Sequence, residues 1–66
     1  MEIVINGQAR EAPEGQTVPA LLEELGLDPS RVAVELDGGI LRQTDWAETA
    51  LHPGARLEIV HFVGGG

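Results

Sequence analysis

One short segment of this chain has the apolar spacing of a helix, and this limits the folds available to it. The apolar residues recur at i, i+3, i+4 and i+7 and form one stripe: Val18, Leu21, Leu22 and Leu25. The Thr17 hydroxyl is expected to cap the start of this helix, and Gly26 to end it in a left-handed conformation. Since one short helix can cover only one face of a sheet, the other segments must form a sheet with one open face.

The rest of the chain carries strand and turn signals. Asn6-Gly7 and Asp37-Gly38 predict two-residue hairpin turns, because these residue types tolerate positive φ. Strands are predicted at residues 1–6, 8–12, 31–36, 40–41 and 56–62. Before the last strand we expect a single helical turn that carries Trp46 and is capped by Thr44, followed by a type II turn at Pro53-Gly54.

This order of elements predicts an α+β fold of the β-grasp type. A mixed sheet of four or five strands would have its first and last strands side by side at the centre, with the helix packed across one face. Residues 1–63 would form this domain and residues 64–66 a glycine tail. The expected core is Ile3, Ile5, Val18, Leu21, Leu22, Leu25, Val32, Val34, Ile40, Leu51, Leu57 and Ile59.

The composition disfavours several classes of function. Eleven acidic residues against four basic ones give a net charge of −7, which opposes binding to nucleic acid. The absence of cysteine excludes disulfides and a thiol nucleophile, and the spacing of His52 and His61 does not predict a metal site. No apolar run approaches the ~20 residues of a membrane span, and no signal peptide is visible, so we expect a cytoplasmic protein. The small size also disfavours a self-sufficient enzyme.

The last predicted strand is apolar on both faces. Leu57 and Ile59 would face the helix, because the intervening Glu58 should remain in water. The open face would then carry a candidate partner interface of Val4, Glu58, Val60 and Phe62. Scattered exposed apolar residues are common, so the alternative is an ordinary surface.

The chain closes with Val63 and three glycines, Gly64, Gly65 and Gly66. One interpretation is a frayed tail without function. The other is a backbone slim enough to enter a narrow channel in a partner, with the Gly66 carboxylate as its chemical group. A carboxylate must be activated before a nucleophile can attack it, and an acyl-adenylate formed from ATP is the direct route. The chain has no GxxxxGK[ST] motif, so ATP and Mg²⁺ would be bound by the activating enzyme and no cofactor by this chain.

Several segments together resemble one family, the sulfur carrier proteins of thiamine biosynthesis. They are MEIVING at residues 1–7, GQTV at 15–18 with Leu21-Leu22, VAVE at 32–35, Trp46, and VGGG at 63–66. The resemblance implies a ubiquitin-like β-grasp fold. It also implies that an E1-like adenylyltransferase activates Gly66, that a persulfide enzyme supplies sulfur, and that the resulting thiocarboxylate donates sulfur to a thiazole synthase.

Other functions remain open at the level of sequence. Sulfur carriers for molybdopterin synthesis or tRNA thiolation would share the fold and the two terminal glycines. A ubiquitin-like protein modifier would too, although a chain without lysine cannot form lysine-linked chains of itself. A generic binding module with an incidental tail is the remaining alternative.

Overall fold

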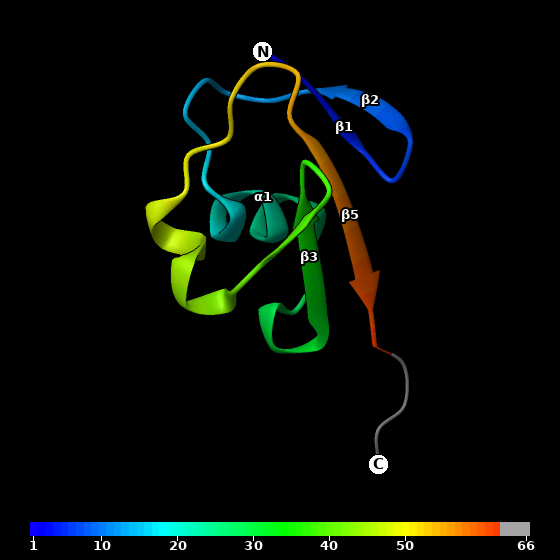
Figure 1. The fold of residues 1–66 in the computed structure, drawn as a ribbon, viewed down its shortest axis with the longest axis vertical. Coiled ribbons are helices and arrows are strands. Elements are labelled where there is room, and N and C mark those ends of the chain that lie inside the picture. The colour runs from blue at the N-terminus through cyan, green and yellow to red at the C-terminus, as the bar shows by residue number, and fades with distance from the viewer. Residues whose placement is uncertain (63–66) are drawn as a thin grey trace.

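A computed structural model describes residues 1–62 of the chain. Its five-stranded mixed sheet has the order β2 (Gln8–Glu11), β1 (Glu2–Ile5), β5 (Arg56–His61), β3 (Val32–Leu36) and β4 (Gly39–Leu41). The one α-helix of the described residues, α1 (Val18–Leu25), packs on one face of the sheet, and two 3₁₀ helices span Pro29–Arg31 and Gln43–Glu48 (Figure 1). β1 and β5 lie side by side and parallel, as the prediction of a β-grasp fold required.

Both hairpins close with the predicted two-residue turns. Asn6 and Gly7 have φ of 49° and 82°, and Asp37 and Gly38 have φ of 50° and 87°. Positive φ at both central residues is the type I′ geometry, whose twist matches that of the flanking strands. The turn sequences therefore fixed which strands pair and in which register.

The two ends of α1 behave differently. Gly26 ends the helix with φ of 73°, its N–H donating to the Glu23 carbonyl, while the Leu27 N–H donates to that of Leu22. This is the predicted left-handed cap. At the start, Thr17 occupies the N-cap position, but its hydroxyl makes no cap hydrogen bond, so that part of the prediction is wrong. Thr44 is not a cap either, because the second 3₁₀ helix already begins after Arg42.

The core is built by α1 and the inner face of the sheet. Its buried residues are Ile3, Ala12, Val18, Leu21, Leu22, Val32, Val34, Trp46, Leu51, Ala55, Leu57 and Ile59. Ile5 and Leu25, predicted as core, are half-buried against it. Trp46 closes one side, where its indole N–H donates to the Leu41 carbonyl over 3.0 Å.

The prediction that Ile40 lies in the core is wrong, since this side chain is 83% exposed. The two-residue turn pairs Leu36 with Gly39, which places Ile40 opposite Glu35. Residues directly opposite each other share a face of the sheet, and Glu35 is exposed. Leu41, opposite buried Val34, turns inward instead.

Candidate functional site

The open face of the sheet carries the candidate interface on β5. Val60 and Phe62 are 55% and 52% exposed, while Leu57 and Ile59, two odd-numbered positions earlier in β5, are buried. The predicted assignment of the two faces is therefore confirmed. Phe62 ends the described chain, so the apolar part of this face lies where β5 leads into the glycine segment.

Val4 shares the open face but lies apart from the other apolar residues. It pairs with Arg56 at the start of β5, whereas Val60 pairs with Ala33 near its end. Four residues along a strand span about 13 Å. Val4 and Val60 are therefore separate contacts on one face, with Glu58 between their levels.

Two acidic side chains lie on the open face beside the apolar residues. Glu58 and Glu35 are exposed and directly opposite each other on β5 and β3, and Ile40 lies opposite Glu35 on β4. Like charges in this position repel, so a basic side chain placed between them would remove an unfavourable interaction. A partner that covers this face would therefore gain from apolar groups and from one basic group between Glu35 and Glu58.

Asn6 holds β5 in place beyond the point where β1 ends. Its side-chain amide donates to the Ile59 carbonyl over 3.1 Å, and its Oδ1 accepts the Ile59 N–H over 2.8 Å. The Asn6 backbone N–H also donates to the Leu57 carbonyl over 2.9 Å. The Asn6 side-chain amide thus makes the hydrogen bonds that a further residue of β1 would make to β5, near the end of β5.

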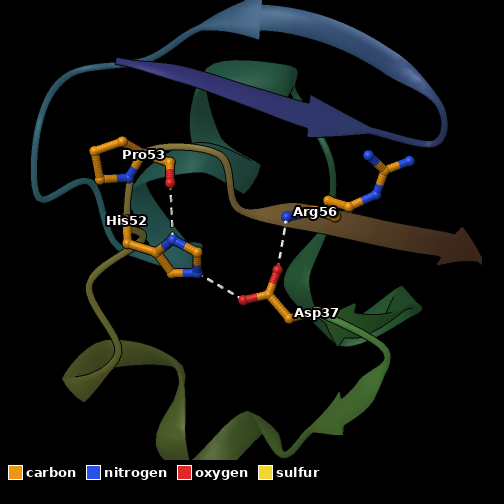
Figure 2. A network of polar contacts seen from close by, with 4 residues as sticks. All are labelled: Asp37, His52, Pro53 and Arg56. Carbon is orange, nitrogen blue, oxygen red and sulfur yellow. Dashed lines mark hydrogen bonds and ion pairs between the residues drawn. The ribbon is translucent and has the colours of Figure 1, made fainter.

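A polar network fixes the start of the same strand (Figure 2). Asp37 in the β3–β4 turn accepts the Arg56 N–H at Oδ1 over 2.9 Å, and its own N–H donates to the Arg56 carbonyl over 2.7 Å. Its Oδ2 lies 2.6 Å from Nε2 of His52, whose Nδ1 lies 2.9 Å from the Pro53 carbonyl oxygen. Both ring nitrogens therefore face acceptors, and only the protonated imidazole can donate to both.

The network shifts the pKa of both of its ionisable groups. The Arg56 backbone N–H, followed by the hydrogen bond from His52, lowers the pKa of Asp37. The hydrogen bond to Asp37, followed by that to the Pro53 carbonyl, raises the pKa of His52. The charged forms of the two groups thus favour each other.

These contacts were only partly predictable from the sequence. Asn6 and Asp37 stood out as turn residues, and their side-chain bonds were not predicted. An Asn or Asp at positive φ beside a strand is the available signal, since its short polar side chain can reach nearby backbone. Gly64, Gly65 and Gly66 lie outside the described residues, so their predicted role stays a prediction.

Two further features concern only residues 1–62. No group of three or more His, Cys, Asp or Glu side chains among them is arranged to hold a metal ion. None of the helices in this part of the chain combines the length and the apolar character needed to cross a membrane.

Comparison with known proteins identifies the family of this chain. The sequence model of the ThiS family matches residues 3–66, nearly the whole chain. The chain belongs to the ThiS family. The sulfur carrier protein ThiS of Escherichia coli is 30% identical to it over 66 residues, with both chains covered completely. The crystal structure of a thiamine biosynthesis protein (ThiS) from Geobacter metallireducens has a TM-score of 0.85 at 30% identity and full coverage of both chains.

A longer relative is more similar in sequence. The thiazole synthase of Paramagnetospirillum magneticum is 47% identical over 66 residues, which are the whole of this chain and 20% of that protein. The chain therefore spans about a fifth of the length of this relative. The ubiquitin-like β-grasp fold of the ThiS family agrees with the sheet order and the single helix described above.

Proposed function

We propose that this ThiS-family chain carries sulfur for thiamine biosynthesis as a thiocarboxylate on Gly66. The general function, a sulfur carrier protein of thiamine biosynthesis, follows from family membership. The single observation that carries the proposal is the family match, which extends to residue 66 and so includes the terminal glycines.

The chemistry requires an enzyme that binds ATP and Mg²⁺. A Gly66 carboxylate oxygen attacks the α-phosphate of ATP, which releases pyrophosphate and leaves an acyl-adenylate. The outer sulfur of an enzyme persulfide then attacks the acyl carbon, and AMP leaves with the bonding electrons. A second thiol attacks the enzyme sulfur of the resulting acyl disulfide, which forms a disulfide and releases the Gly66 thiocarboxylate. We propose an E1-like adenylyltransferase for the first step, an enzyme persulfide as the sulfur source and a thiazole synthase as the acceptor. The thiazole synthase similarity supports this destination. Since the adenylating step uses ATP, we propose a cytoplasmic location.

The proposal is tested by intact-mass measurement. The chain is incubated with the adenylyltransferase of the same organism, ATP, Mg²⁺ and sulfide, and we expect the mass to rise by the difference between sulfur and oxygen. A variant with one alanine added after Gly66 should fold normally and show no change, because its carboxylate is displaced by one residue. Equal conversion of the two chains would refute a role for the Gly66 carboxylate.

We also propose that the open face docks on the adenylyltransferase. The support is the pair of exposed apolar residues Val60 and Phe62, together with the acidic Glu58 beside them. Phe62→Asp should weaken binding about tenfold or more, because an apolar contact is replaced by a buried charge. Calorimetric titration measures this, and Thr44→Asp, at an exposed site outside the sheet, is the control. Equal affinities of the two variants would contradict the docking proposal.

A further inference from the structure

Strand β5 extends well beyond β1, its parallel neighbour. β1 pairs with β5 only through Val4 opposite Arg56 and Ile5 opposite Leu57. On the other side, β3 pairs with β5 as far as His61. Figure 1 shows β5 continuing past the β1–β2 hairpin, where the chain turns away. Among residues 1–62, one side of β5 therefore lacks a neighbouring strand over its last residues.

The hydrogen bonds reveal which backbone groups face this vacant side. The Phe62 N–H donates to the Arg31 carbonyl and the Asp37 N–H to that of Arg56, so even-numbered residues of β5 face β3. Backbone direction alternates in such a ladder, and odd-numbered residues face β1. Ile59 is satisfied there by the Asn6 amide. His61 comes next, and within residues 1–62 no strand pairs with it on that side.

A groove lies beside this free edge. It has a volume of about 320 Å³ and is lined by the ends of β1, α1 and β5: Ile5, Asn6, Leu25, Leu27, Ile59 and His61. Four of these six residues are aliphatic. Ile5, Leu25 and Leu27 are only half-buried, so they retain apolar surface that a partner could cover.

We propose that an extended segment of the adenylating enzyme pairs with β5 at His61 and inserts an aliphatic side chain into this groove. The segment would take the place that a longer β1 would occupy, as in β-strand addition to a sheet edge. This inference rests on the proposed function, and it adds a second contact on the face opposite Val60 and Phe62.

The length of the remaining chain supports this choice of partner. Four residues follow Phe62, and they span at most about 14 Å when fully extended. An enzyme that holds the Gly66 carboxylate must therefore lie against the surface around the end of β5, which includes the groove. A second copy of this chain is a poorer occupant, because each copy carries a net charge of −7 and the copies repel.

Hydrogen exchange on the unmodified protein tests the pairing directly. Amide exchange of the isotope-labelled chain is followed by NMR with and without the adenylyltransferase, in the absence of ATP. We expect exchange at His61 to slow at least tenfold in the complex, because its N–H becomes bonded and buried. The Ala9 N–H is the control. N–H direction alternates along this segment, and the N–H of even-numbered Ala12 donates to Met1. The N–H of odd-numbered Ala9 therefore points away from β1, at the far edge of the sheet, and its exchange should not change.

Backbone esters give a matched test of affinity. At 66 residues the chain is accessible to chemical synthesis, so an ester can replace the amide N–H of His61 or that of Ala9. Each ester also makes the carbonyl of the preceding residue a weaker hydrogen-bond acceptor within a strand ladder. The two esters should therefore destabilise the fold about equally. We expect the His61 ester to bind the adenylyltransferase about tenfold more weakly than the Ala9 ester.

The outcomes separate the two proposals. If the unmodified chain is bound and adenylated but the two esters bind equally and His61 exchange is unchanged, this inference is refuted and the proposed function stands. If His61 is protected by raising the concentration of the chain alone, a second copy is the occupant and the inference is refuted. If the enzyme neither binds nor adenylates the chain, the proposed function fails, and this inference fails with it.

Discussion

Replacing Asn6 with alanine is predicted to destabilise the domain strongly, although this residue lies at an exposed position. The change removes the two hydrogen bonds between the Asn6 amide and the Ile59 backbone. It also places alanine at φ of 49°, a conformation that asparagine tolerates better. The effect should therefore combine lost hydrogen bonding with backbone strain.

The magnitude follows from these two contributions. Two hydrogen bonds at about 1 kcal/mol each and a left-handed penalty of about 1 kcal/mol give a loss of about 3 kcal/mol. A chain of this size has a stability of only about 3–5 kcal/mol. Asn6→Ala should therefore lower the midpoint of thermal unfolding by roughly 12–24 °C.

Urea denaturation followed by Trp46 fluorescence measures this loss, because Trp46 is the only tryptophan and is buried. Asn6→Asp is the matched variant: it tolerates the same φ and still accepts the Ile59 N–H, but its carboxylate faces the Ile59 carbonyl. Protonation gives this carboxyl a donor, so the stability gap between Asn6→Asp and the wild type should narrow as the pH falls. A loss below about 1 kcal/mol for Asn6→Ala, or a gap that does not depend on pH, would refute the reasoning.

The remaining predictions concern the polar network and the core. The raised pKa of His52 means that its stabilisation is complete below its unfolded pKa and is lost as pH rises through its folded pKa. The lowered pKa of Asp37 means that the stabilisation from Asp37 is present above its unfolded pKa and is lost as pH falls through its folded pKa. His52→Gln should therefore cost most stability between about pH 4 and 6.5 and less on either side, and a difference in melting temperature that does not shrink below and above this range would contradict the network. Leu22→Ala should cost about 2–5 kcal/mol in urea denaturation, because the side chain is completely buried. Ile40→Thr, at 83% exposure, should stay within about 0.5 kcal/mol, and similar losses for the two would contradict the assigned faces.

Much of the fold was predictable because its determinants are local. The Asn6-Gly7 and Asp37-Gly38 turns each need two residues at positive φ, and their sequences state this directly. Gly26 likewise ends α1 through bonds within a few residues of itself. With hairpins and helix placed, a single amphipathic helix leaves few arrangements other than a sheet covered on one face.

The errors arose where the outcome depends on distant parts of the chain. The face that Ile40 occupies is set by its register with Glu35, and a shift of one residue would reverse it. The contact between Asn6 and Ile59 joins residues 53 positions apart, so no local pattern contains it. The candidate site was predictable only in part: alternation along β5 gave Val60 and Phe62, while the groove beside His61 needs α1, β1 and β5 in place together.

Under the proposed function, the contacts along β5 would allow a small domain to present its end to larger enzymes. Asp37 holds the strand at Arg56, Asn6 holds it at Ile59, and an N–H to carbonyl bond with Arg31 holds it at Phe62. Fixing a residue's backbone costs about 1–2 kcal/mol, so ordering residues 56–62 on binding would consume on the order of 10 kcal/mol. The fold meets this cost before any partner arrives. The partner that we propose to pair with β5 at His61 would therefore meet a strand already in its bound conformation, and its binding energy would remain available for the chemistry proposed at Gly66.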